Sequence, residues 1–143
     1  MYRLFLPFLF FALAQAQNED KTMLTPVELR HKLHSIPELM FQEFETTKLI
    51  KENIQQLPGI IIHTPTPTGI VVEYTVNSGS YLLFRADIDA LPVVEETGIP
   101  FASTNGNMHA CGHDVHTSIL YQFLNEVVAE KINQNLIFVF QPA

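Results

Sequence analysis

Cysteine and positive charge are scarce in this 143-residue sequence. Cys111 is its single cysteine, so no disulfide can form within the chain, and the thiol must be buried filler, an intermolecular bridge or a ligand. Eight lysines and arginines stand against 15 aspartates and glutamates, which gives a formal net charge of -7. An acidic chain without a basic cluster repels phosphate backbones, and this argues against a nucleic-acid partner.

Long apolar runs are also missing, except for one near the N-terminus. Arg3 supplies a basic start, residues 4–13 are apolar, and alanines flank Gln15, an order typical of a secretory signal peptide. The run is shorter than the roughly 20 apolar residues of a membrane span, so no membrane association is expected after cleavage. The pattern predicts a signal peptide at residues 1–16 and export, to the periplasm or out of the cell, of residues 17–143.

The rest of the sequence alternates between helical and strand patterns. Over all 143 residues, the hydrophobic content of 47% and charged content of 16% are typical of a globular protein. A capping box at residues 25–28 and apolar residues at helical spacing predict three helices, at residues 26–34, 42–57 and 114–131. Short apolar or β-branched runs predict four strands, at residues 60–62, 69–76, 81–86 and 136–140.

The order of these elements predicts how the sheet is built. A short turn at residues 77–80 predicts that strands 69–76 and 81–86 form an antiparallel hairpin. Strand, loop, helix and strand over residues 81–140 form a βαβ unit, whose two strands should be parallel. The wholly apolar residues 136–140 are expected to be buried on both faces of the sheet. The predicted fold class is therefore α/β, with a mixed, largely parallel sheet flanked by helices.

Side chains that can bind metal are densest at residues 108–116. Three histidines, the cysteine and an aspartate lie in this stretch, at or just before the start of the third helix. Cys111 and His113 are close enough in sequence to reach one ion, and thiolate and imidazole are typical ligands of zinc-type metals. The alternative is a helix cap at Asp114 among ordinary polar loop residues, since only two ligands are local.

A pair of carboxylates follows the strand at residues 81–86. Asp87 and Asp89 lie where α/β sheets gather ligands, beyond the carboxyl end of a strand. A carboxylate beside a metal-binding histidine can accept the hydrogen of the other ring nitrogen and so select the tautomer. The alternative is an exposed aspartate pair in a turn. Two nearby acids, Glu95 and Glu96, are interpreted as solvated loop residues.

Three segments of the sequence resemble the aminoacylase/hippurate hydrolase family of metallo-amidohydrolases, which also includes plant auxin-conjugate hydrolases. They are residues 85–92, 96–103 and 108–117, and several residues within 29–43 resemble the opening of the same family. The resemblance implies a zinc-peptidase-like catalytic domain. It also implies hydrolysis of the amide bond of small N-acyl amino acids or similar conjugates.

The same resemblance implies roles for individual residues. Cys111 and His113 would be ligands in a site for two divalent ions (zinc, manganese, cobalt or nickel), and Asp89 would be a carboxylate that supports the metal cluster. Asp87 stands where related peptidases have a metal-binding histidine, so no ligand role is assigned to it. Two residues are interpreted as helix-start residues, or as residues that contact the ligands, rather than as metal ligands themselves: Asp114 and His116.

The resemblance also bears on residues 141–143, which are Gln-Pro-Ala. In the family this motif precedes two adjacent glutamates, the general base and a further ligand, so residues 17–143 would be the N-terminal portion of the catalytic domain and close to inactive alone. One alternative is a non-enzymatic exported fragment that binds at most one metal weakly, and another is an extracellular binding module. A strand at 136–140 without all its partners predicts a poorly soluble or oligomeric chain.

Overall fold

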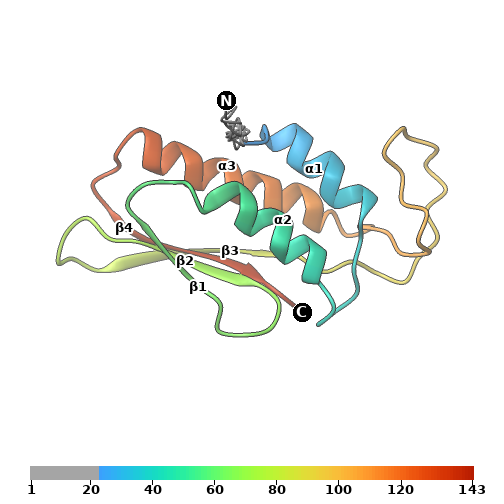
Figure 1. Ribbon diagram of the computed structural model, residues 1–143, viewed down its shortest axis with the longest axis horizontal. Coiled ribbons are helices and arrows are strands. Elements are labelled where there is room, and N and C mark those ends of the chain that lie inside the picture. Colours follow the sequence, from blue (N-terminus) through green and yellow to red (C-terminus); the bar gives the residue numbers. More distant parts are fainter. Residues whose placement is uncertain (1–22) are drawn as a thin grey trace, which may run out of the picture.

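The computed structural model describes residues 23–143, which form a sheet with helices on one face (Figure 1). The helices are α1 (Pro26–Ser35), α2 (Phe44–Ile54) and α3 (His113–Ala129). The strands are β1 (Ile60–His63), β2 (Ile70–Tyr74), β3 (Tyr81–Asp87) and β4 (Asn135–Gln141). The predicted α/β class is confirmed, and each predicted helix and strand is present with its bounds shifted by a few residues. Within the part described, no helix is long and apolar enough to cross a membrane.

The strands lie in the order β1-β2-β4-β3. β3 and β4 are parallel and are joined through α3, which confirms the predicted βαβ unit. β2 is antiparallel to both of its neighbours, β1 and β4, so the sheet is mixed and three of its four strands run in the same direction.

The predicted hairpin between residues 69–76 and 81–86 is wrong, because β4 lies between β2 and β3. The side chain of Asn135, at the start of β4, provides the physical reason. Its Oδ1 accepts hydrogen bonds from the backbone of Val76 (2.8 Å) and Asn77 (3.0 Å), and its Nδ2 donates to Gly79 O (2.9 Å). The turn after β2 is thus bonded to the first residue of the inserted strand, and β2 and β3 cannot pair.

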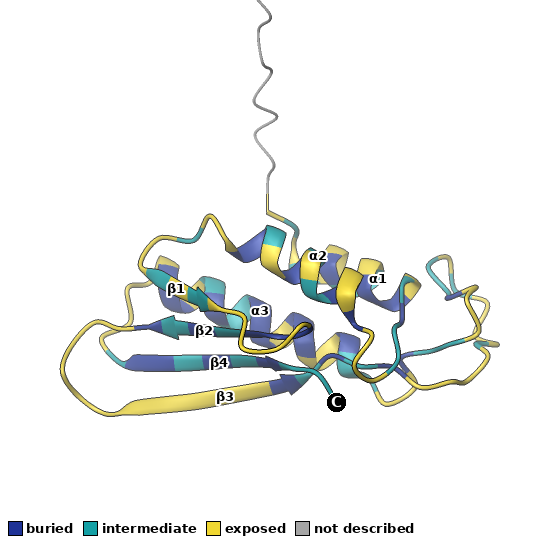
Figure 2. Cartoon of the chain, turned by 60° about the horizontal axis from the view of Figure 1, so that its bottom comes forward, coloured by how far each residue is buried: buried dark blue, intermediate teal, exposed yellow. Residues whose placement is uncertain are grey.

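The apolar core lies between the helices and one face of the sheet (Figure 2). In β4, burial alternates: Phe138 and Phe140 are fully buried beneath the helices, whereas Ile137 and Val139 on the opposite face are half-buried. The prediction that β4 is buried on both faces is therefore wrong for the described residues, because all three helices cover the same face. β4 is paired along both edges, whereas β1 and β3 each have one free edge.

Candidate metal centre

The candidate site lies at the carboxyl ends of β3 and β4, which meet at the same edge of the sheet. Asp87, the last residue of β3, is paired in register with Gln141, the last residue of β4. Just past this pair, the backbone N–H of Ile88 donates to Gln141 O at 3.0 Å. The N-terminus of α3 reaches the same edge, where Gly112 adopts a φ of 84° that allows the chain to turn directly into the helix. Both predicted carboxylates and the cysteine–histidine segment are thereby brought to one edge.

Asp89 and His113 are in direct contact at this edge. His113 Nδ1 lies 2.9 Å from Asp89 Oδ1 and 3.0 Å from the Asp89 carbonyl oxygen. Because both partners are acceptors when the carboxylate is ionised, Nδ1 carries the hydrogen and Nε2 presents its lone pair. The side chains of His113 and Asp89 are 22% and 15% exposed, so solvent reaches part of this pair. This is the arrangement by which a carboxylate prepares a histidine to bind metal.

Cys111 is exposed and precedes the glycine at which α3 begins. A thiolate and an imidazole with a free Nε2 fit a zinc-type ion by their chemistry. Over residues 23–143, however, no group of three or more His, Cys, Asp or Glu side chains lies close enough together to hold a metal ion. The described residues therefore fit part of a metal site, with Cys111 and His113 as its two candidate ligands.

Asp87 and His116 also lie near this pair, but neither side chain contacts Asp89. Asp87 forms an ion pair with Arg85, two residues earlier on β3, and only its backbone carbonyl faces α3, where it accepts from Thr117 Oγ1 at 3.2 Å. His116 lies one turn along α3, with its ring centroid 6.3 Å from that of His113. No ligand role was predicted for either residue, and the predicted ligand set stays a prediction.

A buried ionic network anchors the start of α3 to α1. The Asp114 carboxylate is almost fully buried and accepts from Arg30 Nε at 2.9 Å. The same oxygen lies 2.8 Å from His34 Nδ1, and His34 Nε2 lies 3.0 Å from Glu95 Oε1. Asp114 is therefore turned into the protein, and its role is to hold the first turn of α3, beside His113, against α1.

Glu95 belongs to this network, so its interpretation as a solvated loop residue is wrong. Its side chain has no exposed surface, and Oε2 accepts the backbone N–H of Ser103 at 2.6 Å. The hydroxyl of Thr97, which donates to Oε1, is the main reason that the pKa of Glu95 falls to about 2. Glu96 is exposed, as expected. Local sequence did not reveal the difference, because the loop folds back against α1, about 60 residues earlier.

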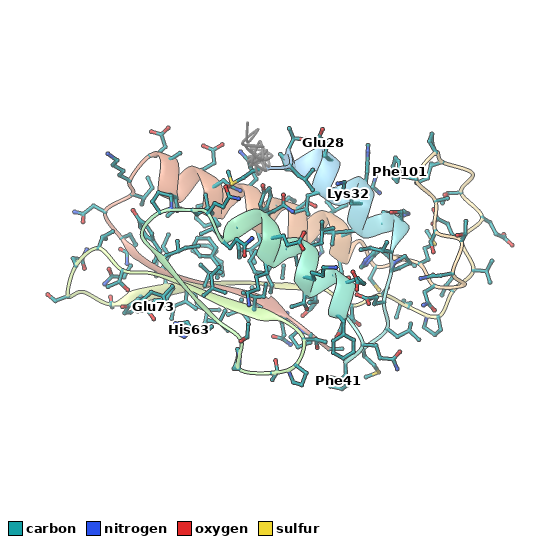
Figure 3. All side chains as sticks on the ribbon, in the orientation of Figure 1. Glu28, Lys32, Phe41, His63, Glu73 and Phe101 are labelled. Carbon is teal, nitrogen blue, oxygen red and sulfur yellow. The ribbon has the colours of Figure 1, made fainter. Side chains whose placement is uncertain are left out.

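An aromatic stack fastens the same loop to α1. The Phe101 ring stacks on His31 with centroids 3.8 Å apart, and the Arg30 guanidinium lies 4.9 Å above its centroid. Figure 3 shows Phe101 on the loop that approaches α1. The loop that carries Asp89 and Cys111 is therefore fixed at its midpoint as well as at its ends.

His109 lies beside the candidate site, and the sequence assigned no role to it. It is 4% exposed, and within residues 23–143 neither ring nitrogen makes a hydrogen bond of ordinary geometry. Burial is the main cause that lowers its pKa from 6.5 to about 4, so the imidazole is neutral near pH 7. The cluster of three histidines was visible in the sequence, but the burial of this one was not.

Fold and site together define a class of protein: an α/β domain with candidate metal-binding side chains at the carboxyl edge of a mixed sheet. Residues 83–143 match peptidase family M20/M25/M40. The matched segment spans nearly all of β3 together with α3, β4 and every predicted site residue. The predicted relationship to binuclear metallo-amidohydrolases is thus confirmed at the level of the family.

Two solved structures resemble this one closely. The YXEP protein of Bacillus subtilis, described as a dinuclear metal binding peptidase from the M20 family, is 42% identical, with a TM-score of 0.73. That match covers 82% of this chain and 35% of the other. A protein from methicillin resistant Staphylococcus aureus is 39% identical, with a TM-score of 0.75 over 83% of this chain and 32% of the other.

Curated relatives are similar over the same region. An N-acetyldiaminopimelate deacetylase of Bacillus cytotoxicus is 48% identical over 120 residues, which are 82% of this chain and 32% of the relative. One from Oceanobacillus iheyensis is 44% identical over 124 residues, or 85% of this chain and 33% of the relative. The chain therefore spans about a third of the length of the curated relatives it matches.

Proposed function

We propose that this chain supplies Cys111 and His113 as two ligands of a two-metal amidohydrolase site, with Asp89 as the carboxylate that orients His113. The observation that carries the proposal is the 2.9 Å contact between His113 Nδ1 and Asp89 Oδ1, which leaves Nε2 free at the carboxyl edge of the sheet. The family match and the neighbour described as dinuclear and metal binding support the same reading.

The reaction we propose is hydrolysis of the linear amide bond of a small N-acyl amino acid. The N-acetyldiaminopimelate deacetylases among its relatives support this substrate class. Bound divalent ions (zinc, manganese, cobalt or nickel) would supply a water of lowered pKa and stabilise negative charge on the carbonyl oxygen. The part of this chain is to hold those ions through Cys111 Sγ and His113 Nε2 and, through Asp89, to keep the His113 hydrogen on Nδ1.

We expect the 143-residue chain to show little or no turnover by itself. A catalytic zinc-type site uses at least three protein ligands, and residues 23–143 hold no group of three suitable side chains. Incubation with Zn²⁺ or Mn²⁺ and an N-acetyl amino acid, followed by detection of free amine, checks this. Metal-dependent turnover would contradict this expectation. Absence of turnover would agree with the alternative of a non-enzymatic chain that binds one metal weakly.

Metal binding itself is tested with Co²⁺, whose absorption spectrum reports thiolate ligation. We expect a saturable thiolate-to-cobalt band in the unmodified chain, its loss in Cys111→Ser, and binding at least about tenfold weaker in His113→Ala. His116→Ala is the matched control, since it removes an imidazole from the same helix and should leave the band unchanged. No saturable thiolate-to-cobalt band in the unmodified chain, or equal Co²⁺ affinity in His113→Ala and the unmodified chain, would refute the proposal.

A further inference from the structure

Glu43 is a fully buried carboxylate at the point where the chain leaves β4. Its Oε1 accepts the backbone N–H of Phe41 at 3.0 Å and that of Ala143 at 3.2 Å. Its Oε2 is also buried and has no hydrogen-bond partner among residues 23–143. Burial of a carboxylate is costly unless hydrogen bonds offset it, and here those bonds go to the backbone of two segments 102 residues apart.

The segment after β4 is enclosed on its other sides as well. A Cβ at Gly69 would lie 2.4 Å from Pro142 Cδ and 2.9 Å from the carbonyl oxygen of Phe140, so only glycine permits this approach. Gly69 has a φ of 83° and donates its N–H to Thr47 Oγ1 at 2.8 Å. Packing against Gly69 therefore fixes the proline, and the bond to Glu43 fixes the residue that follows it.

The backbone beside Glu43 is held in an uncommon conformation. Phe41 has a φ of 59°, which is rare for a residue other than glycine, and its ring is largely exposed just before α2 (Figure 3). The ring is not held by the core, so the turn is stabilised by the hydrogen bond from the Phe41 N–H to Glu43, together with that from the Gln42 N–H to Leu39 O at 2.9 Å. The conformation brings the Glu43 carboxylate to the end of β4.

The connection between α1 and α2 also reaches the exit of β3. The backbone N–H of Ala90 donates to Glu38 O at 2.7 Å, next to Asp89. The Glu38 carboxylate accepts from the backbone N–H groups of Glu45 (3.1 Å) and Thr46 (2.8 Å), and so fixes this connection to the start of α2. One short connection thus holds both strand exits at the candidate metal edge.

We propose that Glu43 is a positioning residue: its carboxylate fixes the backbone that leaves β4 beside the Asp89–His113 pair, through the N–H of Ala143. The role rests on the proposed function, because the edge matters only if Cys111 and His113 bind metal there. It goes beyond that function by assigning a task to a residue that touches neither predicted ligand.

The proposal is tested by amide hydrogen exchange in the 15N-labelled 143-residue chain. We expect exchange of the Ala143 amide to accelerate about tenfold or more in Glu43→Ala, while the Phe138 amide inside β4 keeps its protection. Glu43→Gln keeps an acceptor oxygen and should restore the protection. The matched control is Glu45→Ala, which removes an exposed carboxylate from α2 and should change neither amide. If Glu43→Ala does not fold, Glu43→Asp replaces it, because its shorter side chain withdraws the acceptor.

A second readout connects Glu43 to the metal edge. With Co²⁺ bound, the Ala143 amide should show a paramagnetic shift in the unmodified chain and in Glu43→Gln. In Glu43→Ala the shift should become smaller, because the Ala143 amide is no longer held at one position. The positioning role would be overturned if the Ala143 amide were equally protected in all variants. It would also be overturned if Glu43→Ala reduced the protection of the Phe138 amide as much as that of the Ala143 amide. A missing Co²⁺ band in the unmodified chain would overturn the proposed function instead, and the exchange result would still decide whether Glu43 holds the β4 exit.

Discussion

Asp89 and Asp87 are two aspartates that are separated by one residue but have different partners. Asp89 accepts from His113, whereas Asp87 pairs with Arg85. We expect Asp89→Ala to weaken Co²⁺ binding about 10- to 100-fold, because carboxylates that orient a ligand histidine contribute that much to affinity. Titration followed by the thiolate-to-cobalt band measures it.

Asp87→Ala is the control for this substitution, since it removes a carboxylate from the same edge without touching His113. Co²⁺ affinity should stay within about threefold of the unmodified chain. Equal losses in the two variants would mean that general negative charge, rather than orientation of His113, attracts the ion.

His109 should make the chain sensitive to mild acid. Its pKa is lowered from 6.5 to about 4 in the folded chain, mainly by burial, so the unfolded chain binds the additional proton between these values. Its contribution to the free energy of unfolding is therefore complete above pH 6.5 and decreases as the pH falls toward 4. Urea unfolding across this range should show a smaller loss of stability in His109→Gln than in the unmodified chain.

An exposed histidine provides the comparison for that experiment. His63 lies at the end of β1 beside Glu73 at 3.2 Å and is substantially exposed (Figure 3). His63→Gln should retain the acid sensitivity of the unmodified chain. If His109→Gln retains it too, another titrating group is responsible.

At the scale of an element, Gly112 decides how α3 begins. Its φ of 84° is a conformation that side chains rarely adopt, and a Cβ there would meet nothing within 4 Å. We expect Gly112→Ala to lower the free energy of unfolding by about 1–2 kcal/mol through backbone strain alone, and Gly112→Asn to lower it less because asparagine tolerates this region. Urea denaturation measures both, and equal stability of all three chains would contradict the prediction.

Local patterns predicted the elements well and their pairing less well. The capping box at Thr25 and Glu28 is present as expected, and α3 and β4 lie within two residues of their predicted bounds. The hairpin failed because a short turn permits pairing of its two strands but does not require it. Asn135, more than 50 residues beyond that turn, binds it to β4 instead.

At the scale of the whole molecule, self-association is still expected, but through β3 rather than through β4. β4 is paired on both edges, whereas β3 has a free edge along which Leu82 and Leu83 are 54% and 60% exposed. Unpaired apolar edges favour association between chains. Sedimentation velocity should show oligomers that grow with concentration, and Leu83→Lys should reduce them. Val94→Lys changes a loop residue that is 71% exposed and should have no such effect.

The predicted signal peptide at residues 1–16 lies outside the described residues, so export stays a prediction. Expression in an exporting host and mass measurement of the product tests it, because cleavage would leave a chain that begins near Gln17. Recovery of the full-length chain from the cytoplasm would argue against export.

The sequence by itself determined the order of the elements and the identity of the candidate ligands. The cysteine and histidine at residues 111 and 113, the βαβ unit and the α/β class all follow from residues that are near one another in the chain. The family resemblance singled out Asp89, but the tertiary structure alone decided that its carboxylate contacts His113, that the Glu95 side chain is buried, and that Glu43 reaches Ala143. These contacts join residues 24 to 100 positions apart, and they depend on strand order and loop packing, which local periodicity does not specify.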